Sequence, residues 1–292
     1  IFDMSKKTKM IYDSDKWLKP YKDVIDRRHE MILDLKERLS VDGSLSKGMN
    51  NHMYYGLHRD DKGNWIFREW APNATKIYII GEFNNWKRTE AYALRPIGGG
   101  NWEIVLPGMF LDHGTLYKLY IEWKGGGAER LPAYVTRTVQ DPVTKTFCAQ
   151  AWDPYKPYEW RNAKPGKRPH PLIYECHIGM AAEEEKVGTF EEFRLNVLPK
   201  VADLGYDTLQ IMALQEHPYY GSFGYQVANF FALSSRFGTP EEFKALVDDA
   251  HGLGIAVVMD IVHSHSVDNE AEGLGMFDGK EDLYFYNGWQ GR

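Results

Sequence analysis

The spacing of apolar residues changes along the chain and divides it into regions of different structure. In residues 15–40 the apolar positions recur three or four residues apart; they are Tyr21, Val24, Ile25, Ile32, Leu35 and Leu39. Such positions share one face of a helix, so this region is predicted to be helical. Gly43 and Gly48 follow and favour the end of the helix.

Residues 52–150 have a shorter period. Runs of alternating apolar and polar residues occupy 65–70, 76–80, 102–106 and 116–123. Clusters rich in Gly, Asn and Asp separate the runs, and no helical spacing occurs between them. Short alternating runs with turns between them predict antiparallel strands in an all-β sandwich.

Residues 152–171 are rich in proline and lysine and are predicted to be a linker. Beyond them, apolar runs at 172–178, 206–213 and 255–262 alternate with helical patterns near 190–203 and 240–253. The helices begin at the capping boxes Thr189-Phe190-Glu191-Glu192 and Thr239-Pro240-Glu241-Glu242.

Apolar strands that alternate with helices predict a parallel sheet covered by helices, with right-handed crossovers. The pattern leaves open a doubly wound sheet or an eight-stranded barrel. A complete barrel takes roughly 250 residues, so residues 172–292 have room for only the first part of one.

Composition narrows the class of protein. A chain of 292 residues with 43% hydrophobic and 26% charged residues is typical of a globular protein with two or more domains. The net charge of −6 argues against a nucleic-acid partner. The chain has no apolar run of about 18 residues, so no membrane span is expected. The two cysteines, Cys148 and Cys176, are too few for a disulfide framework, and we expect a reduced, cytoplasmic protein.

The aromatic content has two explanations. Nine Trp, 18 Tyr and 14 Phe make 14% of the chain aromatic. Sugar rings lie with their apolar faces against aromatic rings, which favours a carbohydrate-binding protein. Aromatic side chains also fill the cores of β-sheets, and composition alone does not separate the two.

Four motifs follow one another along the chain, the third of them in two parts (216–226 and 235–240). They are Gly81-Glu82-Phe83-Asn84-Asn85-Trp86 with Tyr117-Lys118, Ile173-Tyr174-Glu175-Cys176-His177-Ile178-Gly179-Met180, Glu216-His217-Pro218-Tyr219-Tyr220-Gly221-Ser222-Phe223-Gly224-Tyr225-Gln226, Ser235-Arg236-Phe237-Gly238-Thr239-Pro240 and Asp260-Ile261-Val262-His263-Ser264-His265. Together they resemble the 1,4-α-glucan branching enzymes of the α-amylase glycoside hydrolase family. The resemblance runs from about residue 17 to about residue 282.

The resemblance implies a multidomain fold. It divides the chain into an N-terminal helical segment (1–50), a β-sandwich similar to carbohydrate-binding module family 48 (51–151), a linker (152–171) and the first three strands of an eight-stranded β/α barrel (172–292). Branching enzymes cleave an α-1,4 bond with retention and pass the glucan chain to a 6-hydroxyl. Their nucleophile and acid/base lie on later barrel strands, beyond Arg292. We therefore expect no catalytic residue in this chain and no activity from it alone.

The resemblance also implies where a glucan binds. Tyr225 is expected to stack on the sugar before the cleaved bond, His265 to donate a hydrogen bond to its hydroxyls, and Asp260 to orient neighbouring polar groups. Trp86 and, less directly, Lys118 are candidates for glucan contact on the sandwich. The expected partner is an α-glucan such as glycogen or amylose. No cofactor is implied.

Each of these residues also has a purely structural interpretation. Taken alone, Tyr225 would more often be a half-buried loop aromatic, and Trp86 and Trp102 are also consistent with sandwich core. His263 and His265 have a spacing that suits metal ligands, but no third ligand converges on them, so no metal is expected. His177 and His217 are predicted to be structural. Glu216 is a carboxylate at the expected barrel mouth that matches neither the nucleophile nor the acid.

Two other functions stay open. A debranching hydrolase of the same family also carries a sandwich before its barrel, but the 216–220 loop and the His-Ser-His ending favour a branching enzyme. A non-catalytic glucan-binding module would end near residue 150, whereas this chain continues with strand and helix patterns to residue 262.

Overall fold

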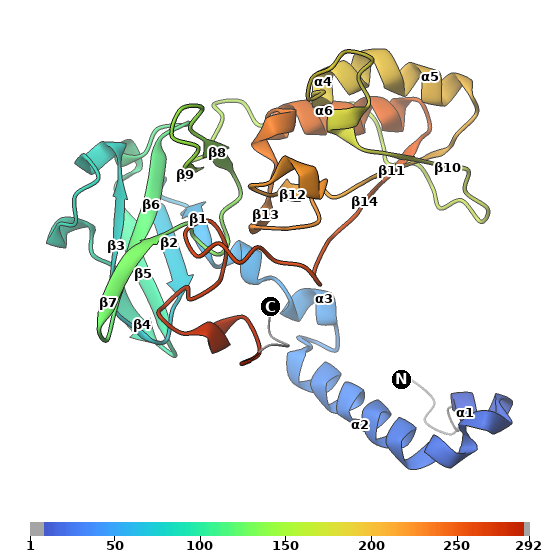
Figure 1. The fold of residues 1–292 in the computed structure, drawn as a ribbon, viewed down its shortest axis with the longest axis horizontal. Coiled ribbons are helices and arrows are strands. Elements are labelled where there is room, and N and C mark those ends of the chain that lie inside the picture. The colour runs from blue at the N-terminus through green and yellow to red at the C-terminus, as the bar shows by residue number, and fades with distance from the viewer. Residues whose placement is uncertain (1–8, 289–292) are drawn as a thin grey trace. The chain divides into compact units, whose positions relative to one another are not determined.

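The structure is a computed structural model that describes residues 9–288. The chain forms two compact units, Ile1–Asn51 and His52–Arg292, and the elements are labelled in Figure 1. Among residues 9–288, no helix is long and apolar enough to cross a membrane.

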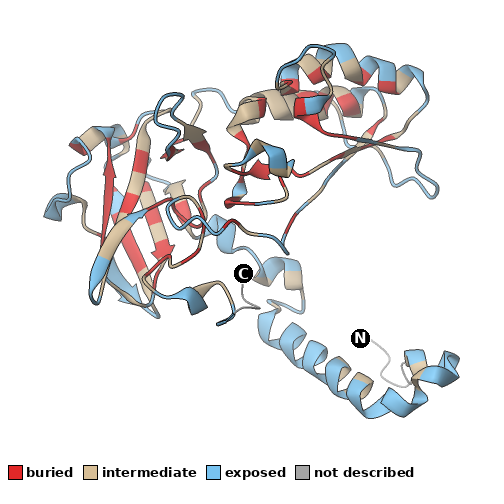
Figure 2. Cartoon of the chain, in the orientation of Figure 1, coloured by how far each residue is buried: buried red, intermediate tan, exposed pale blue. Residues whose placement is uncertain are grey.

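The first unit is helical, as predicted. A short helix α1 (Ile11–Ser14) and a 3₁₀ helix (Lys16–Tyr21) precede α2 (Lys22–Leu39), and α3 (Leu45–Gly48) follows. Asp15 begins the 3₁₀ helix, because its carboxylate accepts the Trp17 N–H at 2.9 Å. No residue of α2 is buried, and its apolar positions Ile32 and Leu35 are exposed (Figure 2).

The second unit begins with the predicted sandwich, which has two antiparallel sheets. One has the order β1 (Gly56–Arg59), β2 (Trp65–Trp70), β5 (Asn101–Leu106), β4 (Arg95–Gly98). The other has the order β3 (Ala74–Gly81), β6 (Leu116–Trp123), β9 (Phe147–Gln150), β8 (Thr138–Gln140), and β7 (Gly126–Arg130) also pairs with β6.

Alternation along the strands builds the sandwich core. On β2 every second residue is buried, beginning with Trp65 and Phe67, and on β6 Tyr117, Leu119 and Ile121 are buried in the same way. The rings of Phe67 and Tyr117 meet edge to face at 6.3 Å and connect the two sheets. Each such side chain contributes about 1.5–3 kcal/mol on burial.

The predicted parallel sheet follows. It has the order β10 (Ile173–Cys176), β11 (Thr208–Ile211), β14 (Ala256–Met259), and all pairs are parallel. The helical segments α4 (Phe190–Glu192), α5 (Leu198–Asp203) and α6 (Pro240–Gly252) connect the strands. Both predicted capping boxes form: Thr189 and Thr239 each accept the N–H three residues on at 3.2 Å. The predicted fold class is therefore confirmed.

One predicted helix is interrupted. Between α4 and α5 the chain makes a π-helical turn at Phe193–Val197, where the Leu198 N–H donates to the Phe193 carbonyl. Pro199 has no N–H to donate to the residue four positions earlier, which explains why regular α-helical bonding fails here.

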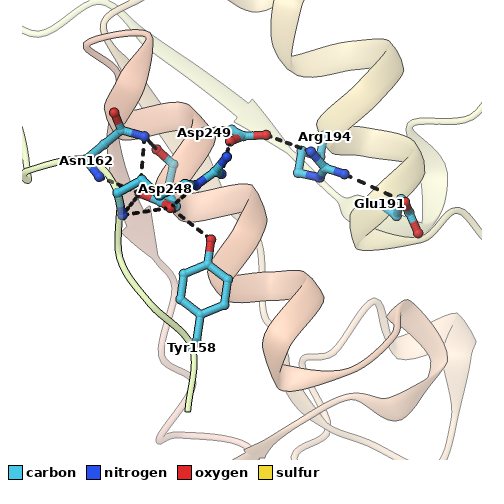
Figure 3. Close-up of polar contacts among 7 residues, drawn as sticks. Tyr158, Asn162, Glu191, Arg194, Asp248 and Asp249 are labelled. Atoms are coloured by element: carbon cyan, nitrogen blue, oxygen red, sulfur yellow. Dashed lines mark hydrogen bonds and ion pairs between the residues drawn. The ribbon is translucent and has the colours of Figure 1, made fainter. Parts of the chain in front are cut away.

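The predicted linker has no regular structure, but one buried carboxylate fixes it. Asp248 on α6 is fully buried and accepts hydrogen bonds from the Tyr158 hydroxyl (2.9 Å), Arg161 Nε (2.9 Å) and the Asn162 N–H (2.9 Å) (Figure 3). Burial alone would raise the pKa of Asp248, but these donors outweigh it and hold the pKa well below its usual range. The linker is thus bound to the helix that covers the sheet.

Candidate functional site

The candidate site lies where the parallel strands end. Tyr225 is in the loop after β11, Asp260 directly follows β14, and His265 comes five residues later. The two loops run side by side, since the Val227 N–H donates to the His265 carbonyl (3.3 Å) and the Val267 N–H to the Val227 carbonyl (3.0 Å). In barrel enzymes this end of the strands carries the binding groups.

A close backbone approach places Tyr225. Gly224, with φ +86°, lies so near β11 that a Cβ there would be 2.2 Å from the Ala213 carbonyl oxygen. Phe223 before it also has a positive φ of 54°. The loop therefore turns back sharply onto the strand end, and only glycine fits at position 224.

Tyr225 and Asp260 meet in the structure. The Tyr225 hydroxyl lies 3.4 Å from Asp260 Oδ2, a long hydrogen bond that the tyrosine donates. Partial burial raises the pKa of Tyr225, and the Asp260 carboxylate raises it further. The ring thus stays neutral at physiological pH.

Gln210 on β11 is a member of this site that the motifs did not indicate. Its Nε2 donates to Asp260 Oδ1 at 3.1 Å and to Glu175 Oε1 at 3.2 Å. One amide on β11 therefore links a side chain of β10 to the residue that directly follows β14. The available signal was an amide side chain between the two apolar residues Leu209 and Ile211 of the strand. Through Asp260, Gln210 fixes the acceptor that Tyr225 uses.

His265 is exposed and lines the same cleft as Tyr225. The cleft has a volume of about 850 Å³, and its lining includes Phe230 and His263. Asp260 lies behind Tyr225 and is not part of this lining. Across residues 9–288, no group of three or more His, Cys, Asp or Glu side chains is arranged to hold a metal ion.

His177 and His217 lie in the core instead. His217 is fully buried, with Nδ1 at 2.9 Å from the Gln215 carbonyl, and the ring of His177 packs edge-on against Phe223 and Phe237. Burial lowers the pKa of both histidines. Burial thus favours the neutral form of both rings, and their structural role stays a prediction.

Glu216, which belongs to a short antiparallel pair after β11, connects the sandwich with the segment between β11 and α6. Its buried carboxylate accepts hydrogen bonds from the Thr138 hydroxyl (3.0 Å) on β8 and from the Ser235 N–H (2.8 Å) and hydroxyl (2.9 Å). A second contact nearby runs from Arg137 Nη1 to the Gly238 carbonyl at 2.6 Å.

On the sandwich, Trp86 and Trp102 differ sharply. Trp102 is 7% exposed and its indole N–H donates to the Ala71 carbonyl at 3.0 Å, so it is a core residue. Trp86 is 38% exposed and has a positive φ of 59°, a conformation that non-glycine residues rarely adopt. The backbone N–H of Trp86 donates to the Gly81 carbonyl. Gly81 in turn pairs with Tyr117, the residue before Lys118 on β6. The Lys118 ammonium is ion-paired with Glu129 at 2.9 Å.

Comparison with known proteins assigns both parts of the second unit. Residues 54–143 match carbohydrate-binding module 48 (isoamylase N-terminal domain), and residues 195–282 match the alpha amylase catalytic domain. The 1,4-alpha-glucan-branching enzyme of Dictyostelium discoideum is 41% identical over 97% of this chain, and that of Rhizophagus irregularis is 42% identical over 95%.

This chain is a homologue of the branching enzymes. The resemblance predicted from the motifs is confirmed. The chain spans 42% of the length of each of these two relatives. Among solved structures, a pullulanase from Bacillus acidopullulyticus superimposes with a TM-score of 0.65 at 18% identity, covering 82% of this chain and 33% of that one. At that identity the likeness concerns the fold alone.

Proposed function

We propose that this chain forms part of a 1,4-α-glucan branching enzyme, which transfers an α-1,4-glucan chain to a 6-hydroxyl and so makes α-1,6 branches in glycogen. The similarity to branching enzymes over almost the whole chain carries the proposal. It favours branching over debranching, because it is far higher than the 18% identity to the pullulanase. A binding module alone would not account for the match at residues 195–282.

The geometry of the cleft supports a role in holding the donor glucan. The face of Tyr225 suits an apolar sugar face and the positive charge that develops on the sugar during cleavage. Asp260 accepts the hydrogen bond of the Tyr225 hydroxyl and so fixes the ring. The exposed imidazole of His265, in the same cleft, has an N–H to offer a sugar hydroxyl.

The chain alone is proposed to be inactive. Retention needs a carboxylate nucleophile and a carboxylic acid about 5 Å apart on opposite sides of the scissile bond. The carboxylates near the strand ends, Glu175 and Asp260, instead both accept hydrogen bonds from the Gln210 amide, outside the lining of the cleft. We further propose a cytoplasmic protein that binds α-glucan and no nucleic acid, consistent with the free thiols of Cys148 and Cys176 and the net charge of −6.

Tyr225 provides the test of this function. In the whole branching enzyme, Tyr225→Ala should lower the rate at least tenfold, which corresponds to about 1.4 kcal/mol of transition-state stabilisation. Tyr225→Phe keeps the ring, loses only a long hydrogen bond, and should stay within about threefold. Initial rates are followed as loss of the iodine–amylose colour. An unchanged rate for Tyr225→Ala would make Tyr225 a packing residue, and branching by residues 1–292 alone would refute the proposed division of the site.

A further inference from the structure

The cleft that holds Tyr225 and His265 has a wall from a third part of the chain. Besides the two loops after β11 and β14, its lining includes Leu274, Tyr284, Phe285 and Tyr286. Tyr286 is 87% exposed, so its ring faces are open to a ligand. We call Phe285 and Tyr286 the aromatic wall.

The chemistry of this wall suits a sugar chain. It adds two aromatic rings to a lining that also has a tyrosine and imidazoles, so the cleft offers apolar faces together with hydrogen-bonding groups. A volume of about 850 Å³ is at the upper end of the range for small-ligand sites, which favours an oligosaccharide over a single sugar.

The wall is attached to the sandwich rather than to the parallel sheet. Phe277 is fully buried in the sandwich core, and Leu274 and Tyr284 pack against that core. The ring of Tyr284 meets Trp70 on β2 edge to face at 6.2 Å and Phe277 at 5.9 Å. The residue directly before the wall, Tyr284, is therefore packed against the sandwich.

Buried polar contacts fix the same segment. Asp278 is fully buried and its Oδ2 accepts hydrogen bonds from the backbone N–H (2.8 Å) and the side-chain amide (2.9 Å) of Asn73. Arg130 on β7 donates to the Met276 carbonyl at 3.0 Å. Gly279 lies so close to the indole of Trp123 that a Cβ would be 2.4 Å from it. The segment from 274 to 284 can thus hold the wall at one distance from Tyr225.

We propose that the aromatic wall binds an α-glucan chain in the cleft, and that the sandwich positions this wall through Phe277 and Asp278. The inference rests on the proposed function of the cleft. It gives the sandwich a role beyond glucan contact at Trp86, because its β2 and the residues before β3 then help to shape the cleft. Tyr286 is the binding residue and Asp278 a positioning residue.

The test measures maltoheptaose binding by calorimetry to residues 1–292 carrying Trp86→Ala, which removes the candidate sandwich site. In this background Tyr286→Ala should weaken binding about five- to tenfold, whereas Tyr286→Phe should stay within about twofold. Tyr155→Ala is the matched control, since Tyr155 is 93% exposed and lies outside the cleft. Equal affinity of the Tyr286→Ala and Tyr155→Ala chains would overturn the inference.

A double-mutant cycle tests the positioning role. Asp278→Ala should weaken binding, while Asp278→Asn should restore it, because one amide oxygen can accept both Asn73 donors. The double variant Asp278→Ala/Tyr286→Ala should bind no more weakly than Tyr286→Ala, since Asp278 acts through that ring. Additive losses would refute this role. If Asp278→Ala does not fold, Asn73→Ala removes one of the two bonds and should give a smaller loss in the same direction.

The outcomes separate this inference from the proposed function. If Tyr225→Ala abolishes binding and Tyr286→Ala leaves it unchanged, the role of the aromatic wall is refuted and the proposed function is retained. If cellohexaose and maltoheptaose bind equally well and Tyr286→Ala abolishes both, the aromatic wall binds sugar chains, but the assignment as an α-glucan enzyme is contradicted. Absence of any binding in the Trp86→Ala chain would overturn both.

Discussion

The Thr138 hydroxyl donates a 3.0 Å hydrogen bond to the buried carboxylate of Glu216 and so joins the sandwich to the segment between β11 and α6. Glu216→Ala would leave the buried Thr138 hydroxyl and the half-buried donors of Ser235 without their acceptor. We expect the free energy of unfolding to fall by about 2–4 kcal/mol. Urea unfolding measures it, with Glu183→Ala as the control, because that side chain is 94% exposed. A change below about 0.5 kcal/mol, as expected for the control, would contradict the assigned role of Glu216.

Trp86 is the most exposed candidate for glucan contact on the sandwich, and its positive φ indicates a conformation retained despite strain. Trp86→Ala should weaken retardation of residues 1–292 in a glycogen-containing native gel by at least threefold in apparent affinity. Trp160→Ala is the matched control, because Trp160 is 54% exposed and lies in the linker. Retardation that survives Trp86→Ala would remove the sandwich site.

Glu69 gives the sandwich a dependence on pH. It is fully buried on β2 and accepts the N–H groups of Trp70 and Ala133, both at 2.9 Å, but burial outweighs these bonds and raises its pKa to about 7 from an ordinary 4.5. Between pH 4.5 and about pH 7, Glu69 holds a proton in the folded protein that it has released in the unfolded chain. The contribution to stability is therefore complete below pH 4.5 and is lost as the pH rises through 7, by about 3 kcal/mol.

Glu69→Gln removes this titration and tests it. Between pH 5 and about pH 8, the stability of the unmodified chain should fall relative to that of the Gln variant when both are unfolded in urea. Parallel pH profiles for the two chains would show that Glu69 does not take up a proton on folding.

Asp248 should make attachment of the linker weaker in acid, whereas the contribution of Glu69 is lost as the pH rises. Because its folded pKa lies below the ordinary 3.8, the stabilisation is present above that value and is lost as the pH falls further. Asp248→Asn places an amide against N–H donors, so hydrogen exchange at the Arg161 and Asn162 amides should speed up at least tenfold and the melting temperature should drop by several degrees. Asp249→Asn, which alters a more exposed neighbour, should leave the Asn162 amide protected. Equal exchange in both variants would argue against the network.

Long periodic segments were predictable from the sequence, whereas short edge strands were not. The runs at 65–70 and 116–123 correspond to β2 and β6 residue for residue, because each strand has one buried and one partly exposed face. β4 (Arg95–Gly98) is exposed throughout and contains Pro96, so no alternation marks it. β7 begins with two glycines and becomes a strand only through pairing with β6.

The candidate site was likewise predictable from the sequence only in part. Tyr225, Asp260 and His265 came from motifs, but their proximity depends on the pairing of the loops at Val227 and Ser266, which no periodicity reports. Gln210 and the wall residues Phe285 and Tyr286 were missed because their partners lie far away in the sequence. The boundaries predicted near residues 50, 151 and 171 stay predictions, as do the roles assigned to the site residues.

The burial of Phe277 in the sandwich has a consequence for biosynthesis. A ribosome releases the strands β1 to β9 well before it reaches Phe277, which follows the entire parallel sheet in the chain. Until then the core of the nascent sandwich lacks Phe277, and its folding cannot be completed domain by domain. That interval of translation is when a chaperone has a surface to hold, and when the growing chain is most prone to aggregate.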